Sequence, residues 1–338
     1  MKIAIIGAGA KSGEKGGAEN FYKGLVSALN QLNVSAELIC PISDESNFKT
    51  IKETYLRFYD LDLSRYDGVI STKAPAYIIR HPNHICYLQH TMRVFYDMFD
   101  IEFSVKSEDL VYQRKFIQVL DTAALQYPRT RKIFVIGNEV KNRLLKYNNL
   151  ESTVLYQGLL DDNFKEGAFN HVFMPGRLHR WKRVDLVIKA MRYVKSPVNL
   201  LISGIGEDEG EFKKLAKGDS RINFLGRVTN EELELLYSNA LCVPFVPIHE
   251  DFGLVTIEAF KSGKPVITCI DSGEPTYFVR NNENGFVCNP DMKDIADKID
   301  YLYQHPHIAK EMGKKGKLST QHVTWKTTAE ILLTSLEN

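Results

Sequence analysis

The chain of 338 residues is long enough for two domains, and its composition, 44% hydrophobic and 25% charged, is typical of a soluble globular protein. Because 43 basic and 42 acidic residues leave a formal net charge of only +1, no whole-protein basic field for nucleic acid is expected. No apolar run approaches the roughly 18 residues of a membrane-spanning helix, so no span is predicted.

The sequence also predicts a reducing compartment. The five cysteines are widely spaced, form no CxxC or Cys/His cluster and are odd in number, which argues against a disulfide framework or a zinc site. The N-terminal MKIAIIGAGA is too short for a signal-peptide core and is interpreted as a first buried strand. We therefore expect a cytoplasmic protein, with peripheral contact at the inner face of a membrane left open.

In the first half of the chain, short apolar runs alternate with longer helical patterns, which is typical of βαβ units and a parallel sheet. Strands are predicted at 2–6, 36–40, 68–70, 84–88, 132–136 and 152–155, with the clearest helices at 18–30 and 110–126. A segment of low apolar periodicity at 158–170 follows, and we interpret it as an interdomain linker.

A second strand series begins after this segment. Its strands are predicted at 171–174, 199–203, 222–224, 241–245, 265–268 and 285–287, and its helices at 185–194, 209–216, 231–239 and 255–262. An amphipathic helix at 325–336 comes last. The predicted fold is α/β, with two doubly wound, Rossmann-like domains at 1–160 and 161–319 and a terminal segment at 320–338. Ligands of such sheets bind beyond the carboxyl ends of the strands, so the expected site is the cleft between the domains.

Glycines follow the first strand. Gly7, Gly9 and Gly13 resemble a nicotinamide-cofactor fingerprint, but the helix is predicted to begin near Ala18, after the later pair Gly16-Gly17. The second strand also ends without an acidic residue to hold a ribose. We select Gly16 and Gly17 as candidate phosphate contacts, and a flexible strand-to-helix turn has equal weight.

Cations and glycines follow the strands of the second half. The run 176–183 reads GRLHRWKR, which places Arg177 and Lys182 between a strand and a helix, a position suited to a diphosphate. A solvated basic turn is the alternative. The exits at Gly204 and at Arg227-Val228 present backbone groups that suit a nucleotide base.

Two acids enclose a glycine turn at 250–258. Gly253 allows a tight turn, and a helix is predicted to begin near Leu254 or Val255, where its first amides suit phosphate or sugar oxygens. Glu258 lies one turn into this helix among apolar neighbours, and two vicinal ribose hydroxyls would satisfy its carboxylate. The alternative is that Glu258 faces water and Glu250 is an ordinary loop acid.

These motifs together resemble family 4 of the retaining GT-B glycosyltransferases, the glycosyl transferases group 1. The resemblance extends in order over nearly the whole chain and rests on Gly16-Gly17-Ala18-Glu19, the segment Gln89-His90-Thr91-Met92-Arg93, Val135-Ile136-Gly137-Asn138, Tyr156-Gln157-Gly158, Gly176-Arg177…Lys182, Phe252-Gly253-Leu254 between Glu250 and Glu258, and Trp325. It implies two domains facing across a cleft, with the terminal helix crossing back to the first.

The resemblance also implies roles for individual residues. Arg177 and Lys182 would hold the donor diphosphate, and Glu258 would bind the ribose. The transferred sugar would contact Glu250 and His90 and the helix start formed by Phe252, Gly253, Leu254 and Val255, while Gly204, Arg227 and Val228 would lie near the nucleotide. Two cations and a helix terminus would replace a metal ion, so neither metal nor cofactor is expected.

Three positions depart from the family pattern: Arg183 where glycine is common, Glu139 where serine is common, and Met92 where a proline is common. The predicted function is retaining, metal-independent hexosyl transfer from a nucleotide sugar to a glycan or lipid-linked acceptor in polysaccharide biosynthesis. UDP-glucose is the favoured donor and GDP-mannose the alternative. The other options are an NAD(P)-dependent oxidoreductase, a non-catalytic sugar-binding protein and, with less weight, a sugar-nucleotide epimerase.

Overall fold

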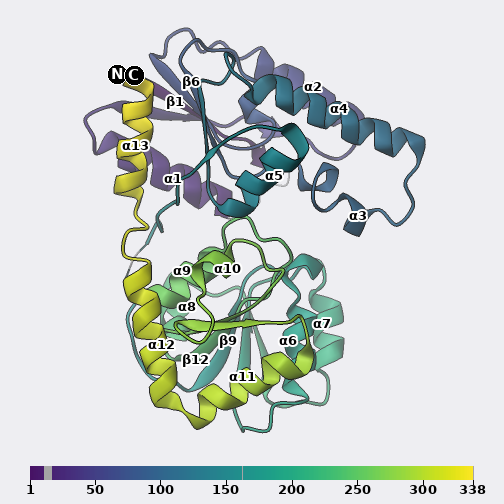
Figure 1. Ribbon diagram of the computed structural model, residues 1–338, viewed down its shortest axis with the longest axis vertical. Helices are drawn as coiled ribbons and strands as arrows, with labels where there is room; N and C mark the ends of the chain where they lie inside the picture. Colours follow the sequence, from purple (N-terminus) through teal and green to yellow (C-terminus); the bar gives the residue numbers. More distant parts are fainter. Residues whose placement is uncertain (11–16, 162, 338) are drawn as a thin grey trace. The chain divides into compact units, whose positions relative to one another are not determined.

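The computed structural model describes residues 1–10, 17–161 and 163–337, and these residues form two compact units. Unit 1 comprises residues 1–160 and 323–338, and unit 2 comprises residues 161–322 (Figure 1). The candidate Gly16 lies outside the described residues.

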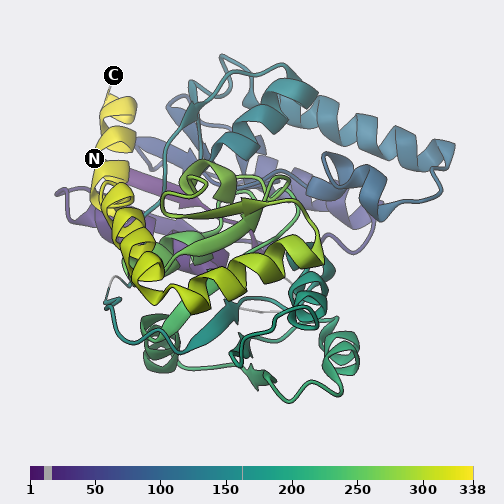
Figure 2. The ribbon, with the colours of Figure 1, turned by 60° about the horizontal axis from the view of Figure 1, so that its bottom comes forward.

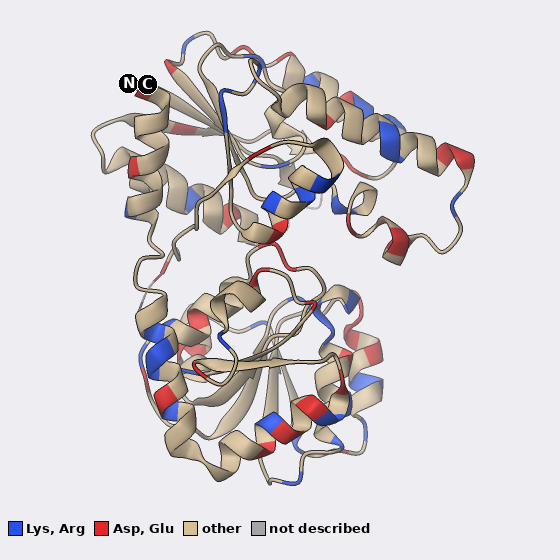
Figure 3. Ribbon diagram, in the orientation of Figure 1, with Lys and Arg blue, Asp and Glu red and all other residues tan. Residues whose placement is uncertain are grey.

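Basic and acidic side chains are interspersed on helices such as α7 (Glu209–Ala216) and α11 (Met292–Gln304), as Figure 3 shows.

Unit 1 contains a six-stranded parallel sheet in the order β3-β1-β5-β6-β7-β8. The strands are β1 (Lys2–Ile6), β3 (Ser35–Ile39), β5 (Gly68–Ser71), β6 (His84–Leu88), β7 (Lys132–Val135) and β8 (Thr153–Val154). The helices are α1 (Gly17–Asn30), α2 (Phe48–Tyr59), α3 (Phe99–Glu102), α4 (Glu108–Leu125) and α5 (Asn138–Asn148), with 3₁₀ turns η1 (Ala76–Ile78) and η2 (Arg93–Phe95). Two short strands, β2 (Gly9–Ala10) and β4 (Ile42–Ser43), pair in parallel and form a separate two-stranded sheet.

Local signals explain where the helices of unit 1 begin. Helix α4 starts two residues before its predicted bound because the Ser107 side chain accepts a hydrogen bond from the Leu110 amide. Helix α2 begins at a capping box formed by Asn47 and Thr50. Helix α1 begins at Gly17, close to the predicted start.

The last helix, α13 (Trp325–Glu337), packs against α1 within unit 1 (Figure 1 and Figure 2). The Trp325 ring lies edge-on to Phe21, with centroids 5.2 Å apart. A Cβ atom at Gly24 would lie 2.3 Å from the Trp325 indole, and one at Gly158 would lie 2.3 Å from the Trp325 amide nitrogen. The indole therefore fits only because two glycines leave space for it.

Unit 2 contains a second six-stranded parallel sheet, in the order β11-β10-β9-β12-β13-β14. The strands are β9 (His171–Pro175), β10 (Asn199–Ser203), β11 (Ile222–Gly226), β12 (Ala240–Pro244), β13 (Val266–Cys269) and β14 (Gly285–Cys288). Besides α7 and α11, the helices are α6 (Val184–Met191), α8 (Asn230–Ser238), α9 (Leu254–Lys261), α10 (Pro275–Phe278) and α12 (Pro306–Ser319), with the 3₁₀ turn η3 (Arg180–Lys182). The predicted strands of both halves are confirmed to within two residues at each bound.

A buried apolar cluster at the central strand β9 forms the core of unit 2. Side chains from β9, β10, α6 and α11 form one buried apolar cluster that includes Val172, Val187, Leu200 and Ile299. Because β10 and β12 flank β9 on opposite sides, the chain changes its winding direction there. In open α/β sheets such a switch point opens a crevice at the carboxyl ends of the strands.

Within the described ranges, no helix is both long and apolar enough to cross a membrane.

The close packing of the Trp325 indole against Gly24 gives a stability prediction. Gly24→Ala places a methyl group on the indole, so we expect the free energy of unfolding to fall by about 1–3 kcal/mol through overpacking. Gly17→Ala in the same helix is the control, because its Cβ would meet nothing within 4 Å. The control should be neutral or stabilising, since alanine favours helix over glycine. Urea denaturation followed by circular dichroism measures both, and equal stability of the two variants would contradict the packing argument.

Candidate functional site

The candidate site lies on unit 2, at the carboxyl ends of its strands, where the exits of β9, β10 and β11 are hydrogen-bonded to one another. The Gly176 amide donates to the Ser203 carbonyl at 3.0 Å, and the Gly204 amide donates to the Gly226 carbonyl at 2.7 Å. Gly204 has a φ of +120°, and a Cβ atom there would lie 1.9 Å from the Gly176 carbonyl oxygen, so no other residue fits. The predicted base contacts Arg227 and Val228 follow β11 directly, beside this close approach.

The first predicted phosphate ligand, Arg177, is paired with an acid that the sequence analysis does not identify. Its guanidinium donates to both carboxylate oxygens of Glu207, with Nε 3.2 Å from Oε2. Both side chains are more than half exposed, at 57% and 55%, so water screens this pair strongly. The only signal for Glu207 in the sequence is its place directly after Gly204-Ile205-Gly206 at a strand exit.

The structure brings two further predicted residues together across the switch point. The ammonium of Lys182 lies 2.5 Å from a carboxylate oxygen of Glu250, and the two side chains are 29% and 19% exposed. Lys182 comes from the exit of β9 and Glu250 from the exit of β12, so neighbouring strands bring together two residues that are 68 positions apart in sequence.

The backbone around Glu250 is fixed on both sides. The Glu250 amide donates to the Ser272 carbonyl at 3.0 Å, and its own carbonyl accepts from the Glu274 amide at 2.9 Å. The loop is also tied to the cationic turn, because the Ile248 amide donates to the Trp181 carbonyl at 2.8 Å. The acid therefore does not lie on a freely moving loop.

The backbone conformation of Arg183 accounts for the glycine that is common at this position. Its side-chain contacts account for the arginine found here. Its φ is +50°, a left-handed conformation in which glycine is favoured. The arginine side chain makes contacts that glycine lacks: it donates to the Val246 carbonyl at 2.5 Å and to the Pro247 carbonyl at 2.7 Å, and it grips both oxygens of Asp271 at 2.7 and 2.8 Å. Arg183 thus joins the exits of β9, β12 and β13.

Helix α9 begins at Leu254, as predicted, and Gly253 makes this start possible. Gly253 has a φ of +79°, and a Cβ atom there would lie 2.9 Å from the Phe245 ring. Phe252 is buried and packs edge-on against Phe278, with centroids 5.7 Å apart. The first amides of a helix lack partners within the helix and carry partial positive charge, so the start of α9 can receive an anion or a sugar oxygen.

Glu258 is half-buried rather than solvated, which contradicts the water-facing alternative. One of its carboxylate oxygens accepts a hydrogen bond of 2.5 Å from the hydroxyl of Tyr237. Burial raises the pKa of Glu258, and the hydrogen bond from Tyr237 opposes this rise. A carboxylate has acceptor sites beyond the one that Tyr237 uses, as ribose binding requires. No sequence pattern marks Tyr237, which looks like an ordinary core aromatic.

The predicted residues of unit 1 lie at the same end of their own sheet. His90 follows β6 and is half-buried, with Nδ1 3.0 Å from the Thr91 carbonyl oxygen. Gly17 is the exposed first residue of α1. Packing requires glycine at position 7, because a Cβ atom there would lie 2.8 Å from the Tyr22 ring. This packing accounts for the first glycine of the nicotinamide-like fingerprint without a ligand.

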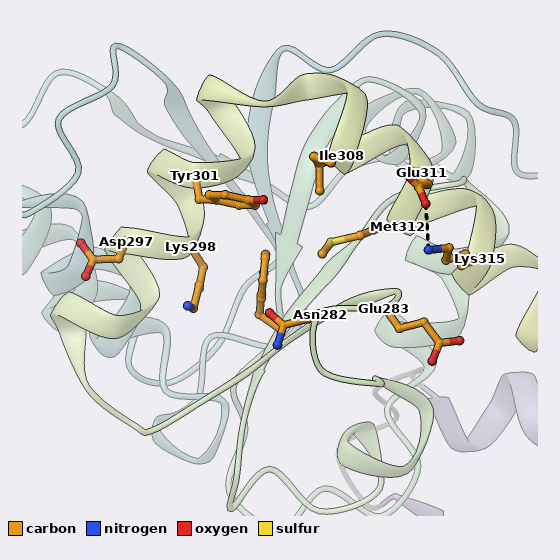
Figure 4. Close-up of a pocket in the computed structure, with 10 residues that line it drawn as sticks. Asn282, Glu283, Asp297, Lys298, Tyr301, Ile308, Glu311, Met312 and Lys315 are labelled. Carbon is orange, nitrogen blue, oxygen red and sulfur yellow. Dashed lines mark ion pairs between the residues drawn. The ribbon is translucent and has the colours of Figure 1, made fainter.

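A cavity of unit 2, of about 550 Å³, lies away from the candidate site residues (Figure 4). Phe286, Tyr301 and Met312 line it, together with charged side chains of α11 and α12. Asn282 and Glu283, which also line it, precede β14, so the cavity lies toward the amino ends of the strands. None of the predicted site residues lines it.

Residues 160–319 match the family described as "Glycosyl transferases group 1", so this part of the chain belongs to that family. Curated relatives include the alpha-1,3/1,6-mannosyltransferase ALG2 of Dictyostelium discoideum, 33% identical over 29% of this chain and 23% of the relative, and that of Homo sapiens, 26% identical over 58% and 51%. A D-inositol 3-phosphate glycosyltransferase of Pseudarthrobacter chlorophenolicus is 30% identical over 52% and 44%. The matched part thus spans about half or less of these relatives.

Solved structures resemble the chain over nearly its full length. A sucrose-phosphate synthase from Thermosynechococcus elongatus superimposes with a TM-score of 0.75 at 18% identity, over 98% of this chain and 97% of that one. Anabaena Alr3699/HepE in complex with UDP-glucose gives a TM-score of 0.71 at 16% identity, over 100% and 99%. At these identities the likeness shows the fold, which is the GT-B fold of glycosyltransferases.

The contacts of Arg183 give a second stability prediction. Arg183→Ala removes charged hydrogen bonds to two carbonyls and a carboxylate, so we expect the free energy of unfolding to fall by about 2 kcal/mol or more. Arg183→Gly should be about 1 kcal/mol more stable than Arg183→Ala, because glycine tolerates the positive φ.

The control for this prediction is Arg280→Ala, which removes an exposed ion pair with Glu283. It should change the free energy of unfolding by less than about 1 kcal/mol. Urea denaturation measures all three variants. A loss in Arg183→Ala no larger than that in the control would show that Arg183 does not hold the loops together.

Proposed function

We propose that this protein is a retaining glycosyltransferase that moves a hexose from a nucleotide sugar to a glycan or lipid-linked acceptor. One observation carries the proposal: the exits of β9 and β12 bring Lys182 and Glu250 together at the switch point of a group 1 glycosyl transferase domain, at the same end of the sheet as Arg177 and the start of α9. This edge offers positive charge for a diphosphate and carboxylates for hydroxyl groups.

In this proposal, Arg177, Lys182 and the start of α9 bind the donor diphosphate. The diphosphate would displace Glu207 from Arg177, which costs about 1 kcal/mol or less because that pair is exposed. It would also draw Lys182 from Glu250 and so free the Glu250 carboxylate to accept hydrogen bonds from the sugar. Arginine suits two phosphate oxygens at once, whereas lysine supplies a compact charge.

The remaining residues would bind the rest of the donor. Glu258 would accept hydrogen bonds from the ribose hydroxyls, with Gly204, Arg227 and Val228 beside the base. His90 and Gly17 of unit 1 belong to the proposal as residues near the transferred sugar and the phosphates.

The proposed reaction breaks the bond between the anomeric carbon and the leaving phosphate oxygen. The acceptor oxygen forms its bond to the same face of that carbon, and the acceptor proton passes to the leaving diphosphate. Arg177, Lys182 and the start of α9 would stabilise the charge that develops on the diphosphate, so transfer without a metal is part of the proposal. Within the described residues, no group of three His, Cys, Asp or Glu side chains is placed to hold a metal ion.

UDP-glucose is the donor that we propose first, and the fold is shared with a protein solved with UDP-glucose bound. GDP-mannose is the second candidate, because several curated relatives are mannosyltransferases. A cytoplasmic location, a role in polysaccharide biosynthesis and peripheral membrane contact complete the proposal.

A thermal-shift panel distinguishes the donors. We expect UDP-glucose to raise the melting temperature, since a ligand at 100 times its Kd adds about 2.7 kcal/mol of stability. GDP-mannose should give a smaller shift and NADPH none. A larger shift with GDP-mannose would assign the mannosyl donor instead. A shift with NADPH and with neither nucleotide sugar would support an oxidoreductase.

The two cations give a prediction about turnover. Arg177→Ala and Lys182→Ala should each lower kcat by about a hundredfold or more, because an oxyanion contact contributes about 3 kcal/mol to the transition state. NMR of the product gives the rate and the anomer, and retained configuration is expected.

Lys213→Ala is the matched control, because it removes an exposed cation of the same unit that pairs with Glu209 within α7. Its turnover should equal that of the wild type. Wild-type rates in both site variants would remove these cations from the mechanism, and an inverted product would contradict retention.

A further inference from the structure

Tyr237 is the buried neighbour of the proposed ribose ligand. It lies near the end of α8, is 0% exposed, and has its hydroxyl 2.5 Å from Oε2 of Glu258. Fully burying a hydroxyl is unfavourable unless it is hydrogen-bonded, and this hydroxyl has a carboxylate as its acceptor. The contact therefore fixes one oxygen of Glu258.

Two aromatic rings hold the ring of Tyr237 in place. Phe173 of β9 meets it edge-on, with centroids 5.0 Å apart and an interplanar angle of 89°. Phe164 meets it at 5.6 Å and 90°. Such edge-to-face pairs add about 0.5–1.5 kcal/mol each beyond the area that they bury. Because the ring is fixed, the direction of its hydroxyl is fixed as well.

Phe164 belongs to a segment, 163–170, that is itself anchored to unit 2. The Gly167 amide donates to the Ser238 carbonyl at 2.9 Å. The buried ammonium of Lys264 donates to the Ala168 carbonyl at 2.7 Å. The segment therefore covers Tyr237 as a fixed part of the unit, although it contains no helix or strand.

We propose that Tyr237 is a positioning residue for the nucleoside: by occupying Oε2 of Glu258 it directs the remaining acceptor sites of the carboxylate toward the ribose diol. Tyr237 touches Glu258 and not the reacting atoms, so it acts through Glu258. The inference rests on the proposed ribose-binding role of Glu258 and adds to it a residue that sets the geometry and the charge of that ligand.

The protonation states support this arrangement. Burial beside Glu258 raises the pKa of Tyr237 well above its ordinary value, so the hydroxyl remains a donor at neutral pH. Burial also raises the pKa of Glu258, while the hydrogen bond from Tyr237 lowers it. Removing the hydroxyl therefore raises the pKa of Glu258 further. The protonated carboxyl accepts hydrogen bonds from a diol less well, so binding should weaken as the pH falls through that pKa.

The test compares ligands that differ in the diol. Tyr237→Phe should weaken binding of UDP, or of GDP if that base is preferred, about tenfold, the usual effect of one hydrogen bond to a charged group. Binding of the 2′,3′-dideoxy analogue and of inorganic pyrophosphate should be unchanged, because neither carries the diol. Isothermal titration calorimetry measures all three ligands.

A pH series gives a readout that a purely structural role would not change. The acidic limb of UDP affinity should move to higher pH in Tyr237→Phe, because the carboxyl loses the donor that stabilises its charge. Tyr303→Phe, which removes the hydroxyl of a partly exposed tyrosine on α11, is the control and should match the wild type. Phe164→Leu keeps the hydroxyl but weakens its support, so it should give a smaller loss with the same selectivity for the diol.

Glu258→Gln separates this inference from the proposed function. If Glu258→Gln weakens UDP and spares the dideoxy analogue while Tyr237→Phe binds both like the wild type, Glu258 binds the ribose and the positioning role is wrong. If Glu258→Gln does not discriminate between UDP and its dideoxy analogue, the proposed ribose site is wrong. Equal weakening of UDP, the dideoxy analogue and pyrophosphate by Tyr237→Phe would show a structural defect and would overturn the inference.

Discussion

The change of winding direction at β9 is the constraint on which the site depends. Because β10 and β12 lie on opposite sides of β9, the loop that leaves β9 runs beside the exits of two strands, and backbone hydrogen bonds and side chains together hold it. Arg183 contributes to this hold by binding the carbonyls of Val246 and Pro247 and the carboxylate of Asp271. Lys182 precedes it in the chain and meets Glu250 on the loop that Arg183 secures. The positions of Lys182 and Glu250 thus follow from the contacts that join the exits of β9, β12 and β13.

The joined loops also place opposite charges in contact. Arg177 is paired with Glu207, and Lys182 with Glu250. Each pair supplies its cation with a counter-ion at the edge of the sheet, and in the proposed function the donor diphosphate would replace that counter-ion. An exposed pair such as Arg177–Glu207 is weak, whereas water screens the less exposed Lys182–Glu250 pair less. Exchange of partners at Lys182 would therefore couple diphosphate binding to the release of Glu250.

The strands and the order of the site motifs could be predicted because they depend on local chemistry. Buried parallel strands are apolar runs, and a glycine before an apolar helical pattern predicts a helix start, as Gly253 does for α9. The family of residues 160–319 could be recognised for the same reason, since its motifs are short. Helices α2 and α11 are absent from the predicted set, although Asn47 and Asp291 cap them and each helix buries one face, so local pattern was sufficient to predict both. The partners of the site residues could not be predicted, because the contacts from Arg177 to Glu207 and from Glu258 to Tyr237 depend on strand order.

The segment 163–170 shows why a low-periodicity stretch can still shape a site. Its lack of pattern predicts a linker, yet Phe164 packs on Tyr237 and the Ala168 carbonyl accepts from Lys264. A single aromatic side chain and one buried cation can anchor a chain without helix or strand, and neither produces a periodic signal. Tyr237 in turn donates to Glu258. Two contacts, from Phe164 to Tyr237 and from Tyr237 to Glu258, therefore connect this segment to the proposed ribose ligand. A substitution in the segment would therefore act on the geometry of the proposed donor site.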